Sequence, residues 1–204
     1  MAEPISGATP LEGYGKRILL IIGTPKSISL GHALAEAYAQ GARSKGHVVR
    51  VLKLGEMDFD PVLRGGYESA QTLEHDLLEA QREVHWAQHL VFVYPVWWGG
   101  LPSLLGGFFD RVFMPGFAFK VHGRHHPSNE LLKGRTAELL VTMDTPSRYF
   151  RWVFKAPAHR QMVRTILEFC GIKTTRLTEF SPVRSSTEEQ RQQWIRDAEA
   201  LGKR

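Results

Sequence analysis

Short apolar runs alternate along the chain with stretches of helical periodicity. The run over residues 17–22 is continuous, rich in isoleucine and closed by Gly23. Such a run is typical of a strand that is buried on both faces of a parallel sheet. Residues 30–44 then carry apolar side chains at three- and four-residue spacing, which predicts a helix that ends before Gly46.

The same alternation continues to the end of the chain. Further strands are predicted over residues 47–52, 90–94, 137–142 and 172–180, and further helices over 71–88, 101–113, 158–169 and 187–201. Strand and helix thus alternate five times without an internal repeat, which favours a doubly wound α/β sandwich with right-handed crossovers. We expect one domain over residues 16–204, preceded by a flexible tail over residues 1–15 that lacks periodicity.

Charge is unevenly distributed over the 204 residues, whose formal net charge is +5. Between Arg148 and Arg176 seven basic residues stand against one acid, Glu168, an excess larger than that of the whole chain. Without a nucleic-acid-binding motif such a patch is more typical of a solvated face, and we expect no nucleic-acid partner. The patch also suits a phosphate-bearing cofactor or an anionic partner.

Membrane insertion and secretion are not predicted. The start of the chain lacks the apolar core of a secretory signal, and the most apolar region, residues 90–119, is interrupted by two prolines and by the pair Asp110–Arg111. The one cysteine, Cys170, excludes an internal disulfide, and its apolar neighbours favour a buried, inert thiol. We expect a soluble, cytoplasmic protein without stable membrane insertion.

The loops that follow the first, third and fourth strands are where a ligand is expected, because open parallel sheets bind ligands at the carboxyl ends of their strands. The first loop, Gly23–Ser29, is rich in hydroxyl groups, carries Lys26 and leads into a helix. Free N–H groups at a helix start suit a phosphate. The dinucleotide and Walker glycine patterns are absent, and the alternative is that Ser29 is only a helix N-cap.

The loop after the third strand contains two adjacent tryptophans, Trp97 and Trp98, followed by Gly99 and Gly100. Neighbouring side chains of an extended chain point in opposite directions, so at least one tryptophan should face a cavity or a partner. An aromatic wall beside glycine backbone suits a planar heteroaromatic ring such as a flavin. The alternative is two tryptophans that pack the loop.

The loop after the fourth strand, residues 142–152, mixes polar groups with aromatic residues. It suits a second wall of a ring-binding site, or it is an ordinary connection with an exposed aromatic cluster.

Together these loops resemble the flavodoxin-like NAD(P)H:quinone oxidoreductase family. The likeness is carried by GTPKSIS at 23–29, FDPVL at 59–63, LVFVYPVWWGGLPSLLGGFFDRVFMPGFAF at 90–119 and LEFCGI at 167–172. The resemblance implies a flavodoxin-like three-layer sandwich with a five-stranded parallel sheet in the order 2-1-3-4-5. It also implies an FMN cofactor, with FAD as an alternative, NAD(P)H as co-substrate and a homodimer whose sites form at the subunit interface.

The resemblance also implies which residues bind the flavin. Those matching the phosphate segment are Thr24, Ser29, Leu30 and Gly31, those matching the ring segment are Pro95, Val96, Trp97, Trp98 and Gly99, and those matching the loop at the pyrimidine side are Thr142, Met143, Asp144 and Thr145. The chain departs from the family where Thr24 replaces a frequent histidine and where Asp144 and Thr145 replace glycines.

The resemblance implies the catalytic residues less directly than the flavin-binding residues. The family places a tyrosine and a histidine beyond the pyrimidine-side loop, and the candidates by order along the chain are Tyr149 and His159. Phe150, Trp152 and Phe154 suit either the subunit interface, a membrane quinone contact or the core.

The function implied is hydride transfer from NAD(P)H through FMN to a quinone or a similar acceptor. Backbone N–H groups near residues 96–99 would then stabilise negative charge on the reduced ring. Two alternatives on the same fold are a flavin- and nucleotide-binding ancillary subunit of a potassium efflux system and a one-electron carrier, although carriers are usually acidic.

Two groups of histidines give weaker indications of a functional site. His85 and His89 lie four residues apart and could share a helix face, which is metal-ligand spacing, but no further ligand follows in pattern. His122, His125 and His126 are expected to be exposed loop residues.

Overall fold

A five-stranded parallel sheet forms the centre of the protein. The computed structural model describes residues 15–67, 69, 71–120 and 129–204, so residues 1–14 of the predicted tail and His122, His125 and His126 lie outside the described residues. The strands of the sheet are β1 (Arg17–Ile22), β2 (Val48–Lys53), β3 (His89–Pro95), β6 (Thr136–Thr142) and β7 (Lys173–Phe180). They are hydrogen-bonded in the order β2-β1-β3-β6-β7, and every neighbouring pair is parallel.

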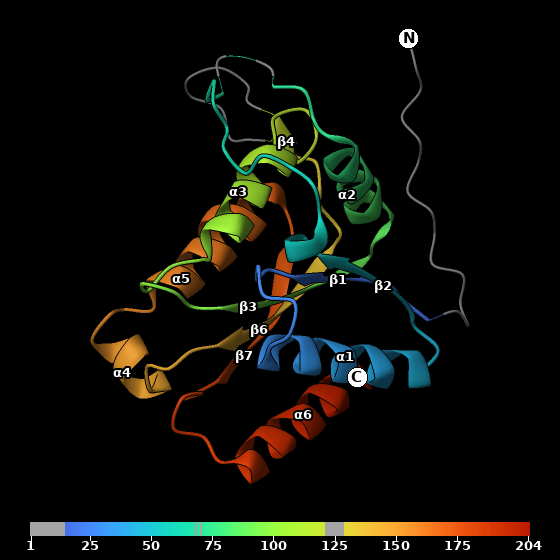
Figure 1. Cartoon of the computed structure of the whole chain (residues 1–204). Helices are drawn as coiled ribbons and strands as arrows, with labels where there is room; N and C mark the ends of the chain where they lie inside the picture. The colour runs from blue at the N-terminus through green and yellow to red at the C-terminus, as the bar shows by residue number, and fades with distance from the viewer. Residues whose placement is uncertain (1–14, 68, 70, 121–128) are drawn as a thin grey trace.

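Helices cover both faces of the sheet. They are α1 (Leu30–Ser44), α2 (His75–Trp86), α3 (Ser103–Val112), α4 (Ser147–Trp152), α5 (Pro157–Arg160) and α6 (Glu188–Gly202). The pair α1 and α6 packs on one face, while α2, α3 and α5 lie on the other (Figure 1). This arrangement confirms the predicted three-layer α/β sandwich.

Two apolar cores, one on each face, explain why the first strand is apolar throughout. Ile18, Leu20 and Ile22 of β1 are buried in the core shared with α1 and α6. Leu19 and Ile21, which point to the opposite face because side chains alternate along a strand, are buried in the core shared with α2 and α3. The continuous apolar pattern in the sequence therefore does correspond to a strand covered on both sides.

The strand order differs in its numbering from the predicted one. Two short strands that the pattern did not predict, β4 (Phe119–Lys120) and β5 (Asn129–Glu130), pair antiparallel and lie in the chain between β3 and β6. Counted over all strands, the sheet order is therefore 2-1-3-6-7, with β4 and β5 in a separate two-stranded sheet.

Two helix predictions were wrong at their ends. The helix predicted over 71–88 begins only at His75, because the preceding side chains serve the loop before it: Gln71 accepts a hydrogen bond from the Arg64 N–H, and Glu74 binds Arg111. It ends at Trp86, which places His89 on β3 and removes the helical spacing between His85 and His89.

The helix predicted over 158–169 is split. It consists of α5, a π-helical stretch over Gln161–Leu167 and a short 3₁₀ turn over Glu168–Cys170. The short helix α4 before it was not predicted at all.

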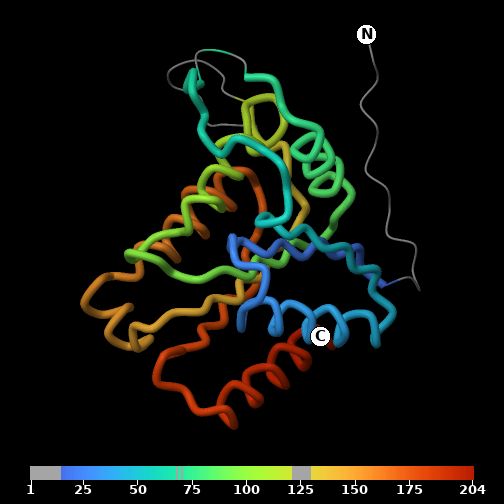
Figure 2. The backbone as a smooth tube through the Cα atoms, in the orientation of Figure 1, coloured from blue at the N-terminus to red at the C-terminus, as the bar shows by residue number. Residues whose placement is uncertain are grey.

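The strands β1, β3 and β6 run in the same direction and end on the side where α4 lies, at the left of the backbone trace (Figure 2). The loops that follow these strands are thus gathered at one edge of the sheet, as the sequence predicted.

Candidate functional site

A cleft of about 320 Å³ opens at the carboxyl ends of β1, β3 and β6. The predicted cofactor residues that line it are Thr24, Ser29, Leu30, Gly31, Pro95, Val96, Trp97, Thr142, Met143 and Asp144. Trp98, Gly99 and Thr145 were also predicted, and they are adjacent in sequence but do not belong to the lining among the described residues. The cleft therefore brings the three predicted loops together.

The start of α1 forms one end of the cleft. Ser29 has extended backbone (φ −163°) and its hydroxyl accepts a hydrogen bond from the His32 N–H, so it is the helix N-cap. Burial, and then the charge of Lys53, lower the pKa of His32, so its ring is neutral near pH 7. The first turn of α1 contains no acidic residue. This end of the cleft therefore offers a positive helix terminus that suits an anionic group.

Two cationic side chains line the cleft, Lys26 from the loop after β1 and Arg191 from α6. Arg191 is oriented by hydrogen bonds from its guanidinium to the Ser186 hydroxyl at 2.9 Å and to the Val183 carbonyl. Reasoning from the sequence missed Arg191, since it belongs to no motif and lies far along the chain from the other lining residues. A helix N-terminus together with two cations is the chemistry of a phosphate site.

The middle of the cleft is bordered by a tight turn over Trp97–Gly100. The two end residues exchange backbone hydrogen bonds, and the two central residues have positive φ, 53° for Trp98 and 76° for Gly99. Trp97 lines the cleft, while the Trp98 side chain is fully exposed. The expectation that at least one tryptophan faces a cavity is thus confirmed.

The expected role of the backbone at residues 96–99 needs correction. The Val96 N–H donates to the Thr142 carbonyl at 2.8 Å, and the Trp97 N–H donates to the Gly100 carbonyl at 3.2 Å. These two donors hold the sheet and the turn together, so they do not point free into the cleft toward a ligand.

Tyr94 offers a polar group that the sequence did not single out. Tyr94 is one of the residues that line the cleft, its side chain is buried in the core shared with α2 and α3, and its hydroxyl has no hydrogen-bond partner within the described part of the chain. Burial raises the pKa of this phenol, which keeps it protonated. Buried hydroxyl groups are normally paired, so this one fits a ligand with a polar edge.

The far wall of the cleft is formed by Met143 and Asp144 at the end of β6. The Asp144 carboxylate accepts a hydrogen bond from the Arg184 N–H at 2.7 Å, and the Val183 N–H donates to the Met143 carbonyl. Asp144 therefore holds the loop after β7 against the cleft.

Tyr149 and His159 do not line the cleft. Tyr149 lies on α4 with half of its surface exposed and contacts Phe154 edge to face. His159 is buried, and its Nε2 atom lies 2.7 Å from Oε1 of Glu179 on β7. Participation of either residue in catalysis stays a prediction.

Three further possibilities raised by the sequence are a metal site, a reactive cysteine and a membrane-spanning segment. The residues that the structure describes contain no group of three or more histidine, cysteine or carboxylate side chains that could hold a metal ion. Burial raises the pKa of the Cys170 thiol to about 12, which confirms an inert cysteine. In the described ranges no helix has the length and apolar character that crossing a membrane would require.

The sheet order and the cleft at its carboxyl edge are those of a flavodoxin-like α/β protein, and a family model described as flavodoxin-like fold matches residues 16–201. The chain belongs to the flavodoxin-like NAD(P)H:quinone oxidoreductase family.

Its relatives include the ribosyldihydronicotinamide dehydrogenase (quinone) of Rattus norvegicus, 28% identical over an alignment of 226 positions that covers 93% of each chain. Among solved structures, the NAD(P)H:quinone oxidoreductase from Methanothermobacter marburgensis has a TM-score of 0.78 at 22% identity, covering 93% of this chain and 96% of that one. An FMN-dependent NADH-azoreductase from Bacillus anthracis, solved with FMN, has a TM-score of 0.68 at 17% identity, covering 91% and 97%. The protein is an oxidoreductase. None of these three relatives is a subunit of a potassium efflux system, and that alternative is left without support.

Proposed function

We propose that the protein is an FMN-dependent oxidoreductase that passes hydride from NAD(P)H to a quinone or a similar acceptor. The observation that carries the proposal is a single cleft with a phosphate-type end, an aromatic border and an unpartnered buried hydroxyl. The FMN-dependent neighbour, solved with FMN, supports the choice of cofactor.

The residues of the cleft fit this cofactor in three ways. The N-terminus of α1, Lys26 and Arg191 would bind the phosphate. Trp97 would cover the ring and exclude water from one side of it. The hydroxyl of Tyr94 would pair with a polar atom of the cofactor.

Bound FMN would supply the hydride chemistry, accepting the hydride from NAD(P)H and passing it on to the acceptor. The protein then needs to bind and orient the reactants, which agrees with a cleft whose described lining contains no paired carboxylates. Asp144 is the lining group that carries negative charge, and it is held by the Arg184 N–H.

A homodimer is part of the proposal. Large apolar side chains are exposed on α4 and just after it, where a second copy would cover them; they are Tyr149, Trp152, Val153 and Phe154. Exposed apolar side chains that gather on one element mark an interaction site.

A fluorescence titration tests the cofactor. FMN, with FAD as a second arm, should quench tryptophan emission, because Trp97 lines the cleft. Ser29→Ala should raise the dissociation constant for FMN about tenfold or more, the effect of losing a hydrogen bond to a charged group. Ser44→Ala makes the same change at the other end of α1 and should leave the constant unchanged.

Steady-state oxidation of NADH and NADPH with menadione then tests the reaction. Turnover that requires added FMN and saturates with both substrates is expected. A protein that binds neither flavin at saturating concentration, or that binds FMN without oxidising either nucleotide, would contradict the proposal.

A further inference from the structure

One buried carboxylate outside the cleft holds two side chains of a single segment. Glu179 lies near the end of β7 and its side chain is only 3% exposed. His159 Nε2 lies 2.7 Å from its Oε1, and Arg151 binds it with two nitrogens, Nε at 3.1 Å and a terminal nitrogen at 2.5 Å. Both partners belong to residues 147–159, which we term the α4–α5 segment.

The electrostatics show that this carboxylate is ionised and fully engaged. Burial alone would raise the pKa of Glu179, but hydrogen bonds, chiefly from His159 and Arg151, lower it to about 2. Arg151 is more than half exposed and sits on the outer side, whereas the His159 side chain is nine-tenths buried. The inner contact is therefore a buried carboxylate–imidazole pair, and breaking it leaves a buried partner without its counterpart.

The α4–α5 segment packs directly behind the cleft. Phe150 and Ala158 form a small core with Met143 and with Val96, both of which line the cleft. The Ala158 N–H also donates to the Gly99 carbonyl at 3.1 Å, which ties the segment to the Trp97–Gly100 turn. A shift of the segment would therefore move two walls of the cleft.

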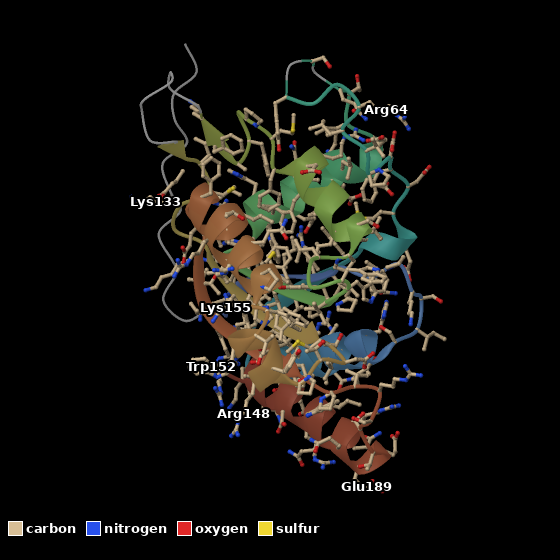
Figure 3. The ribbon with its side chains drawn as sticks, turned by 90° about the vertical axis from the view of Figure 1, so that its left-hand side faces the viewer. Arg64, Lys133, Arg148, Trp152, Lys155 and Glu189 are labelled. Atoms are coloured by element: carbon tan, nitrogen blue, oxygen red, sulfur yellow. The ribbon has the colours of Figure 1, made fainter. Side chains whose placement is uncertain are left out.

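The backbone of the segment shows that it needs such an anchor. Lys155 and Ala156 have φ of 60° and 45°, a left-handed conformation that residues with side chains rarely adopt. Two such residues in succession persist only where the surrounding contacts determine them. Arg148, Trp152 and Lys155 lie on the outer surface of this region, on the face turned toward the viewer in Figure 3.

We propose that Glu179 is a positioning residue: through Arg151 and His159 its carboxylate holds the α4–α5 segment against the Trp97–Gly100 turn and thereby sets the opening of the cleft for the acceptor. The second half of this statement rests on the proposed function, while the anchoring itself does not.

Limited trypsin digestion of the flavin-free protein tests the anchoring alone. Glu179→Gln keeps the size of the side chain, but its amide turns an N–H toward one of the two donors, Arg151 or His159, so one contact is lost. Cleavage after Lys155 should become about tenfold faster as the segment opens locally. Glu199→Gln removes the carboxylate of the exposed pair with Lys203 on α6 and should be cleaved at the wild-type rate.

Arg151→Gln is the second variant, because it removes only the exposed partner and should fold normally. It should accelerate cleavage after Lys155 less than Glu179→Gln does. Wild-type cleavage rates in both variants, with folding confirmed by circular dichroism, would overturn the anchor whether or not the protein binds flavin.

Kinetics with two acceptors test the positioning. Glu179→Gln should raise the KM for menadione about tenfold, with kcat changed less than threefold, because a quinone has to fit the opening. Ferricyanide takes electrons without being held in the cleft, and its kinetics should stay within twofold of the wild type. Equal losses with both acceptors, or an unchanged KM for menadione beside faster cleavage, would overturn the positioning role.

Discussion

His89 lies at the start of β3 with 7% of its surface exposed, and its Nδ1 atom is 2.7 Å from the Thr136 hydroxyl. Burial, followed by the nearby charges of Lys16 and His47, lowers the pKa of this imidazole from 6.5 to about 4. The pKa is lowered even though the Glu138 carboxylate lies 3.9 Å from Nε2, because burial is the largest cause. His89 is therefore neutral in the folded protein at pH values where the unfolded chain would already protonate it.

This difference makes His89 a source of acid sensitivity. Because the folded pKa is depressed, the unfolded state binds more protons between pH 6.5 and 4, and stability falls as the pH is lowered through that window. From pH 7 to pH 5 the loss amounts to about 2 kcal/mol. His89→Asn keeps a partner for Thr136 and should remove most of this loss, as measured by urea unfolding at both pH values. The same loss in the variant as in the wild type would contradict the assignment.

At the level of single residues, the sequence could predict the part of the site that lies in contiguous loops. Ser29 and Trp97 were found because a hydroxyl before a helix and an aromatic residue after a buried strand have local signatures. Arg191 and Tyr94 were not. Arg191 reaches the cleft through tertiary packing of α6, and Tyr94 reads as an ordinary member of a buried strand.

At the level of elements, the Trp97–Gly100 turn has a conformation that its sequence does not favour. Positive φ at both central residues is the geometry of a type I′ turn, where Asn-Gly is preferred and a bulky residue in the first central position is strained. Trp98 occupies that position with its side chain fully exposed, so it gains no burial in return. Strain without compensation in the fold is typical of a functional position.

Trp98→Asn should therefore stabilise the flavin-free protein by about 1 kcal/mol, since asparagine adopts positive φ more readily. Tyr67→Asn is the matched control, because Tyr67 is also exposed but lies in the turn before α2, outside the proposed dimer surface; we expect a change within about 0.5 kcal/mol. Urea unfolding measures both. A destabilised Trp98→Asn protein would show that the indole makes a stabilising contact in solution. An unchanged dissociation constant for FMN would remove Trp98 from the predicted cofactor residues.

The accuracy of the element predictions follows from how each element is stabilised. Strands and long helices with continuous periodicity, such as β1 and α1, were predicted almost to the residue. α4 and α5 were missed or misjudged because they are held by the Glu179 contacts and by left-handed backbone at residues 155–156 rather than by an amphipathic pattern.

At the level of the whole molecule, the two cores and the alternating chain order made the sandwich predictable, since a strand covered on both faces requires helices on both sides. Assembly is harder to predict, because exposed aromatic residues in a sequence look the same as buried ones. The structure separates them: Phe150 is buried, whereas Trp152 and Phe154 are 75% and 51% exposed.

These exposed residues belong to the α4–α5 segment, which packs against two walls of the cleft, so the proposed dimer should bury them and complete the site. Wild-type protein should sediment at twice its 23.1 kDa chain mass at micromolar concentration. Trp152→Glu places a charge in the interface without touching a core, and should weaken the dimer by about 2 kcal/mol or more, about thirtyfold. Leu78→Glu makes the same kind of change on α2, away from α4, and should leave the dimer intact (Figure 1). Turnover of Trp152→Glu should rise with protein concentration, because two chains are needed for one complete cleft. A wild-type protein that sediments as a monomer yet turns over fully would contradict the dimer and assign the exposed aromatic surface to another partner.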